Sequence, residues 1–108
     1  MNLEFYKSLF SSYEQYREKS LHHLQVRFSD IQPLIKKVNL RREIDIFTIG
    51  LSIEDREISA IRVGQGQTHV LLWSQMHGSE TTATKAIFDV LNYLFSDQHD
   101  TPFVRTIL

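Results

Sequence analysis

A histidine and a glutamate three residues apart, His77 and Glu80, carry the clearest chemistry in this sequence. They belong to the motif His-Gly-Ser-Glu, and an imidazole nitrogen and a carboxylate oxygen are ligands suited to Zn²⁺. The spacing alone is short enough to occur by chance. A second interpretation therefore stays open, in which Glu80 favours the positive end of a helix and the ring of His77 is hydrogen-bonded at a strand end.

The motif lies where an apolar strand is expected to give way to a helix. Residues 69–76 (HVLLWSQM) are apolar on both faces, which predicts a central strand and places Trp73 in the core. Ser79 can cap the next helix, whose apolar stripe predicts an end near Phe95. Ligands of open α/β sheets gather at the carboxyl ends of strands, and a bend through Gly78 would let both side chains converge there. Placement thus supports the metal interpretation more than spacing does.

The preceding part of the chain is expected to be helical. Apolar residues at three- and four-residue steps predict an amphipathic helix over about residues 3–19. Ser29 can cap a second short helix, with Pro33 within its first turn or so, where a missing N–H is tolerated. Residues 1–40 are therefore expected to form a helical front segment.

From Glu43 the periodicity changes to that of strands. Residues 43–50 and 58–64 read as strands joined by a polar turn, which predicts an antiparallel hairpin. The next segment, Gly-Gln-Gly-Gln at 64–67, precedes a strand rather than a helix, so we interpret it as a turn in which glycine supplies positive φ, not as a nucleotide loop. Thr101 and Pro102 predict a further helix start close to the chain end.

The composition and charge of the chain exclude several classes of function. Hydrophobic residues make up 42% and charged residues 23% of the 108 residues, as in ordinary globular chains. The net charge of -1 gives no reason to expect a nucleic-acid or membrane partner. No apolar window approaches the roughly 18 residues of a membrane span. The absence of cysteine excludes disulfides and thiolate chemistry. Because the start MNLEFYKSLF does not resemble a signal peptide, we expect a cytoplasmic protein, or else the mature part of a trimmed one.

Residues 44–108 together closely resemble the amino-terminal part of M14-type zinc carboxypeptidases. The resemblance rests on Gly-x-Ser-x-x-x-Arg-x-Ile at 50–58, followed by a strand-like run that ends in the His-Gly-x-Glu motif at 77–80. Two positions depart from the family pattern. Asp55 stands where many members have glycine in the turn, and Ser79 stands where digestive members often have arginine, which weakens assignment to that branch.

The resemblance implies a hydrolase in which Zn²⁺ activates a water for attack on a peptide or amide carbonyl. It implies that His77 and Glu80 are two of three zinc ligands. The third ligand, the substrate-binding residues and the catalytic glutamate of the family lie well downstream of the motif. The sequence therefore predicts the truncated start of a peptidase domain over residues 41–108, inactive alone.

Other residues in the chain do not replace the missing groups. His69 and His99 lie too far along their expected elements, about 26 and 28 Å away. The adjacent pair His22 and His23 is not excluded by distance, but such loop histidines are usually exposed. Arg56 is expected to form a local ion pair in the hairpin turn rather than to bind substrate.

The fold expected from these observations is α/β: the amino-terminal part of a zinc-exopeptidase-like mixed sheet, with about three strands flanked by helices and preceded by two helices. The expected function is that of a zinc metallocarboxypeptidase hydrolysing C-terminal peptide bonds. Two alternatives stay open: a zinc deacylase acting on N-acyl amino acids, and a non-catalytic assembly module. An unpaired sheet edge is expected to favour self-association.

Overall fold

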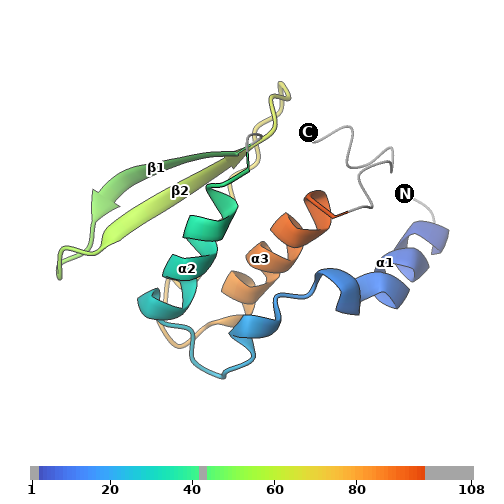
Figure 1. The fold of residues 1–108 in the computed structure, drawn as a ribbon, viewed down its shortest axis with the longest axis horizontal. Helices are drawn as coiled ribbons and strands as arrows, with labels where there is room; N and C mark the ends of the chain where they lie inside the picture. The colour runs from blue at the N-terminus through green and yellow to red at the C-terminus, as the bar shows by residue number, and fades with distance from the viewer. Residues whose placement is uncertain (1–2, 42–43, 97–108) are drawn as a thin grey trace.

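The computed structural model describes residues 3–41 and 44–96 (Figure 1). Along the chain these residues form helix α1 (Leu3–Tyr16), a single 3-10 turn η1 (Lys19–Leu21), helix α2 (Phe28–Val38), strands β1 (Ile44–Leu51) and β2 (Glu57–Val63), and helix α3 (Thr82–Leu94). The α/β class and the two leading helices are confirmed. The predicted helix start at Thr101 lies outside the described residues.

The two strands form the predicted antiparallel hairpin. Ile44 pairs with Val63 at its base, and a register shift interrupts the ladder between Thr48 and Gly50. Asp55, in the connecting turn, has a φ of 56°. This left-handed conformation is the one glycine adopts most easily, and aspartate is among the few other residues that tolerate it. The departure from the family pattern at this position is therefore compatible with the turn.

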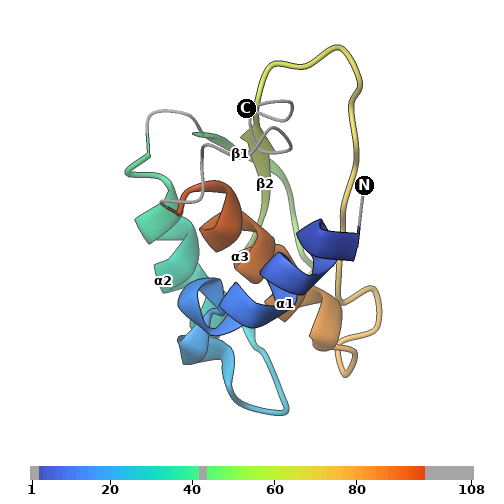
Figure 2. The same cartoon turned by 90° about the vertical axis from the view of Figure 1, so that its right-hand side faces the viewer.

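The core lies where the helices meet the base of the hairpin. Helix α3 runs between α2 and α1, and α1 crosses it on the side away from the hairpin (Figures 1 and 2). The buried hydrophobic residues come from the helices, η1, β1 and the loops, and β2 adds the partly buried Ile61 and Val63. They are Tyr16, Leu21, Val26, Leu34, Val38, Ile44, Phe88, Leu91, Tyr93, Leu94 and Phe95. The far end of the hairpin projects away from the helices, with Leu51 and Ile53 exposed.

Helix α1 is attached to α3 through a buried carboxylate. Asp89 accepts hydrogen bonds from the hydroxyl of Tyr13 at 2.8 Å and from the backbone N–H of Glu18 at 2.6 Å. The hydrogen bond to Asp89, followed by partial burial, raises the pKa of Tyr13. Burial would raise the pKa of Glu18, but hydrogen bonds from Ser20 and Asn92 outweigh that effect and lower it. Helix α3 is thus the element that orders the front segment.

The helix ends differ from those predicted. Helix α1 ends at Tyr16 instead of residue 19, and α2 begins at Phe28 instead of after a Ser29 cap. Arg27 is the N-cap residue, and its backbone N–H donates to the carboxylate of Asp30. The acidic side chain three residues after the N-cap thus stabilises the start of the helix. Pro33 lies deeper in α2 than its first turn.

The third predicted strand does not form. Residues 69–76 belong to a long loop that runs from β2 to α3 (Figure 2), and Trp73, expected in the core, is 64% exposed. A strand that is apolar on both faces needs a hydrogen-bonding neighbour and a covering layer on each side. The described residues supply one hairpin, with the packed helices on one side of it. The apolar run therefore lacks the surroundings that would make it a central strand.

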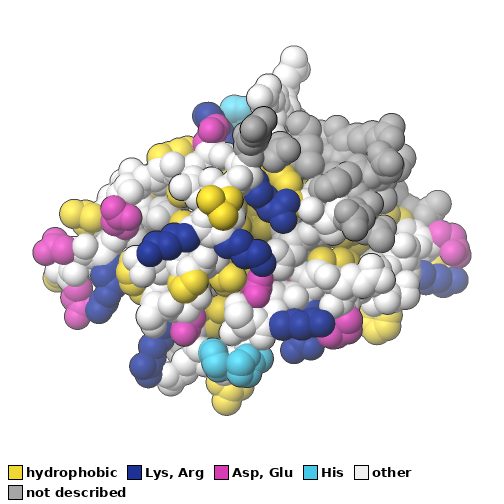
Figure 3. All heavy atoms as spheres, in the orientation of Figure 1, with side chains coloured by type: hydrophobic (Ala, Val, Ile, Leu, Met, Phe, Trp, Pro, Cys, Tyr) yellow, Lys and Arg dark blue, Asp and Glu magenta, His cyan; other side chains and the backbone are white. Residues whose placement is uncertain are grey.

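The described helices include none that combines the length and apolar character needed to cross a membrane. On the face shown in Figure 3, Lys and Arg side chains alternate with Asp and Glu instead of forming a basic patch. Yellow hydrophobic side chains lie between them.

Replacing Asp89 with alanine should destabilise the fold by about 3 kcal/mol, because it leaves the Tyr13 hydroxyl and the Glu18 N–H without their charged acceptor. Asp45→Ala is the matched control, since Asp45 pairs with Arg62 on an exposed surface. That change should cost less than about 1 kcal/mol. Urea unfolding of the two variants measures the difference, and equal losses would contradict the role assigned to Asp89.

We also expect the chain to self-associate, because the loop from β2 to α3 exposes Leu71, Leu72 and Trp73. Leu72→Lys should lower the association constant about tenfold or more, which corresponds to about 1.4 kcal/mol. Thr68→Lys adds the same charge to the same exposed loop without removing apolar surface, and should leave association unchanged. Sedimentation equilibrium measures both, and a monomeric wild-type chain at high concentration would contradict the expectation.

Candidate metal centre

The structure brings His77 and Glu80 together in a tight turn just before α3. The backbone N–H of Glu80 donates to the carbonyl of His77 at 3.0 Å, which closes the turn. The Nδ1 atom of His77 lies 3.1 Å from Oε2 of Glu80. Both side chains are well exposed, at 70% and 68% of their free surface. The two candidate ligands therefore converge as expected, although the turn follows a loop and not a strand.

The separation of the two donor atoms suits a metal ion. With Zn–N and Zn–O bonds near 2.1 Å, two neighbouring ligands of a tetrahedral zinc lie roughly 3.4 Å apart. The observed 3.1 Å between Nδ1 of His77 and Oε2 of Glu80 is close to that value. In this structure the same two atoms form a direct ion pair or hydrogen bond with each other. The donor set and its spacing thus fit zinc, while a simple His–Glu pair accounts for the contact without one.

Within residues 3–41 and 44–96, no group of three or more His, Cys, Asp and Glu side chains could hold a metal. The rings of His22 and His23 lie 4.0 Å apart between centres and are tilted by 51° to each other, and His22 hydrogen-bonds to the carbonyl of Lys19. His69 is exposed in the loop after β2, and His99 lies outside the described residues. Among the described residues, His77 and Glu80 are therefore a pair of candidate donors without a third beside them.

Gln75 is the residue at this site that the sequence analysis missed. Its Nε2 donates to the carbonyls of Val26 at 2.8 Å and Gly78 at 3.0 Å, and its Oε1 accepts from the hydroxyl of Thr84 at 2.7 Å. Its φ is 52°, so the left-handed residue of this bend is Gln75 and not Gly78. Ser74 and Gln75 are both polar residues near the end of the apolar run, so the sequence pattern does not single out Gln75.

The loop between η1 and α2 lies against the start of α3 and the turn. We call residues 22–27 the front loop. The hydroxyl of Thr81 donates to the carbonyl of Leu24 at 2.9 Å, and the ammonium group of Lys85 donates to the carbonyl of His23. Thr81 is the N-cap of α3 in place of the predicted Ser79, and its side chain bonds to the front loop instead of capping the helix.

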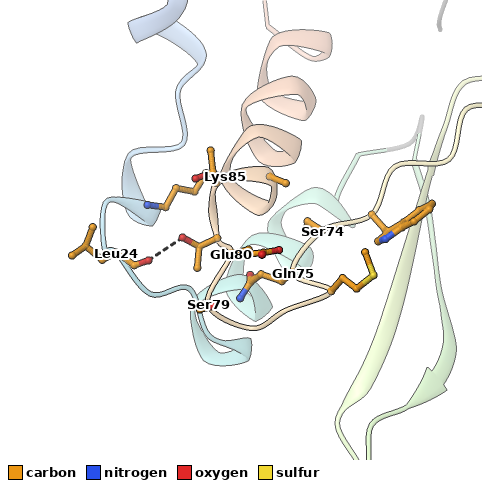
Figure 4. A pocket seen from close by; sticks show the side chains of 11 residues that line it. Leu24, Ser74, Gln75, Ser79, Glu80 and Lys85 are labelled. Carbon is orange, nitrogen blue, oxygen red and sulfur yellow. Dashed lines mark hydrogen bonds between the residues drawn. The ribbon is translucent and has the colours of Figure 1, made fainter.

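A shallow hollow opens beside this turn. Its lining includes Leu24, Trp73, Met76, Glu80 and Lys85. Leu24 comes from the front loop, and Lys85 lies near the start of α3 (Figure 4). The apolar side chains that line it are mostly exposed. A group bound next to the donor pair would therefore contact both apolar and charged side chains.

The turn of the hairpin lies apart from His77 and Glu80. Two residues of the family-like pattern, Ser52 and Arg56, form hydrogen bonds within this turn. The hydroxyl of Ser52 accepts the backbone N–H groups of Glu54 at 3.3 Å and Arg56 at 3.1 Å, and its own N–H donates to the carbonyl of Arg56 at 2.8 Å. Arg56 forms an ion pair with Glu54, as predicted. Gly64, directly after β2, has a φ of 80°, so glycine supplies positive φ there as predicted, although residues 64–67 lead into the long loop and not into a strand.

Comparison with known proteins places these features in a family. The family model for zinc carboxypeptidases, peptidase M14, matches residues 34–108, which include the second half of α2 from Leu34 on, the hairpin, the donor turn and α3. The front loop and α1 precede the matched residues. Neither the curated proteins nor the solved structures gave a match. Because the family model covers more than half of the chain, this chain belongs to the zinc carboxypeptidase family.

Proposed function

We propose that His77 and Glu80 are two protein ligands of a zinc ion in a metallocarboxypeptidase that hydrolyses C-terminal peptide bonds. The observation that carries this proposal is the 3.1 Å separation of Nδ1 of His77 and Oε2 of Glu80, within the part of the chain that matches the family. Their residue types suit zinc, and their exposure leaves room for further ligands.

When bound, the zinc ion supplies Lewis-acid chemistry, polarising the substrate carbonyl and lowering the pKa of a water. The role of this chain is to present the donors. His77 binds as the neutral imidazole, with the proton on the ring nitrogen that faces away from Glu80. Glu80 contributes the negative charge. The closed turn between them keeps both side chains on one side of the start of α3.

Two donors do not complete such a centre, because catalytic zinc sites take three protein ligands and a water. The described residues hold no third donor beside His77 and Glu80. We therefore propose that this 108-residue chain binds zinc weakly and does not turn over peptides on its own. Its substrate, in the complete site, is a peptide with a free carboxylate end.

The proposal predicts that His77→Ala weakens Zn²⁺ binding about tenfold or more, since it removes one of two donors, and that Glu80→Gln does the same. His69→Ala is the matched control, because it removes an exposed histidine of the neighbouring loop, outside the motif. Competition with a chromophoric chelator measures the affinities.

These titrations are best made in a chain that also carries His22→Ala and His23→Ala, since two adjacent, exposed imidazoles can bind zinc themselves. Equal affinities of the His77→Ala and His69→Ala chains would overturn the assignment of the ligands. Chelator-sensitive release of a C-terminal amino acid by the purified chain would overturn the proposal that it is inactive alone.

A further inference from the structure

We infer that Gln75 is a positioning residue of the donor turn, and that it fixes the turn by bonding to the front loop. This inference rests on the proposed function, because it concerns the geometry of His77 and Glu80 as zinc ligands. It adds a residue and a segment of the chain that lie outside the metal motif itself.

The first step is that burial does not hold the two donors in place. The side chains of His77 and Glu80 are 70% and 68% exposed, so packing fixes neither of them. Their positions depend on the backbone of the turn and on what that backbone is bonded to. The carbonyl of Gly78, between the two donors in sequence, is bonded to Nε2 of Gln75 at 3.0 Å.

The second step is that both the nitrogen and the oxygen of the Gln75 side-chain amide form hydrogen bonds. One N–H goes to Gly78 in the turn, the other goes to Val26 in the front loop, and the amide oxygen accepts the hydroxyl of Thr84 in α3. A φ of 52° is unfavourable for a non-glycine residue and persists only where surrounding contacts hold it. The single side chain thus ties the donor turn to two other segments.

The third step is that the front loop is held on both sides of the donor turn. Gln75, two residues before His77, bonds to the carbonyl of Val26, and Thr81, directly after Glu80, bonds to the carbonyl of Leu24. Thr81 and Thr84 are among the few buried polar residues, and each has its hydrogen bond. The turn that carries the donors is therefore braced against the front loop at its beginning and its end.

The fourth step is that this brace comes from outside the family match. The front loop precedes residue 34, where the match begins. It is joined to η1, and the N–H of Glu18 just before η1 is bonded to Asp89 of α3. Residues that precede the family match thereby set the geometry of the turn that carries His77 and Glu80. Loss of such supporting hydrogen bonds typically lowers metal affinity 10–100-fold.

The test replaces Gln75 with methionine, which keeps the length of the side chain and removes its amide. Gln67→Met is the matched control, because Gln67 is an exposed glutamine in the loop after β2. Two readouts are measured on the full chain. Solvent-exchange NMR follows the N–H of Glu80, which is bonded within the turn, and chelator competition follows the affinity for Zn²⁺.

In Gln75→Met we expect the Glu80 amide to exchange several-fold faster and the Zn²⁺ affinity to fall about 10-fold or more. The N–H of Ser52, bonded within the distant hairpin turn, should exchange as in the wild type and reports that the fold persists. Gln67→Met should match the wild type in both readouts.

If Gln75→Met loses protection at Ser52 as well, Gln75→Glu replaces it. Glutamate keeps the acceptor for Thr84 but places an oxygen where Nε2 bonds to the carbonyls of Val26 and Gly78. The same two changes are expected. Unchanged zinc affinity in the folded Gln75 variant overturns the inference, whether or not the Glu80 amide exchanges faster, because Gln75 then does not position the donors.

This result is distinguishable from failure of the proposed function. If His77→Ala weakens Zn²⁺ binding while the Gln75 variants bind normally, the ligand assignment stands and only the positioning role falls. If His77→Ala and the wild type bind Zn²⁺ equally, the proposed function falls, and the inference that rests on it falls with it.

Discussion

The rest of this structure depends on one set of hydrogen bonds. They join polar side chains at the start and in the middle of α3 to the residues that precede α2. Asp89 accepts the N–H of Glu18, and Thr81 and Lys85 donate to carbonyls of the front loop. The backbone groups that they bond lie outside helices and strands, so no regular secondary structure supplies them with hydrogen-bond partners. Helix α3 thereby fixes α1, the front loop and the donor turn relative to one another.

The same arrangement explains how an exposed motif can be well placed. The side chains of His77 and Glu80 are exposed, so burial does not hold them, and the short turn between them is closed by the hydrogen bond from the Glu80 N–H to the His77 carbonyl. The supporting hydrogen bonds lie beside the turn, where Gln75 is bonded to the front loop, the turn and α3, and Thr81 is bonded to the front loop. Supporting shells of this kind orient ligands in metal sites generally.

The loop from β2 to α3 shows the opposite case, in which strong local character does not produce an element. Its run of large apolar residues has the composition of a buried strand, yet Val70, Leu71 and Trp73 are exposed. A strand forms through bonds to a neighbour, and the described residues pair β1 with β2 and nothing else. The apolar face left open is the chief source of exposed hydrophobic surface near the donor turn.

The amino-acid sequence by itself determined the elements that depend on local contacts. Periodicity located the helices and the hairpin to within a few residues, Asp55 and Gly64 adopt the positive φ that their turns require, and the order of motifs identified the family. It also brought His77 and Glu80 together, because three residues in a closed turn leave their side chains adjacent.

Only the tertiary structure decided where each segment finds its partners. It left residues 69–76 as a loop, moved the caps of α2 and α3 to Arg27 and Thr81, and gave Gln75 a role that no local pattern announces. The physical reason is the same in each case. Burial and long-range hydrogen bonds depend on both segments that come together, and the sequence of one segment does not reveal its partner. Gln75 and Val26, for example, are 49 residues apart in the chain.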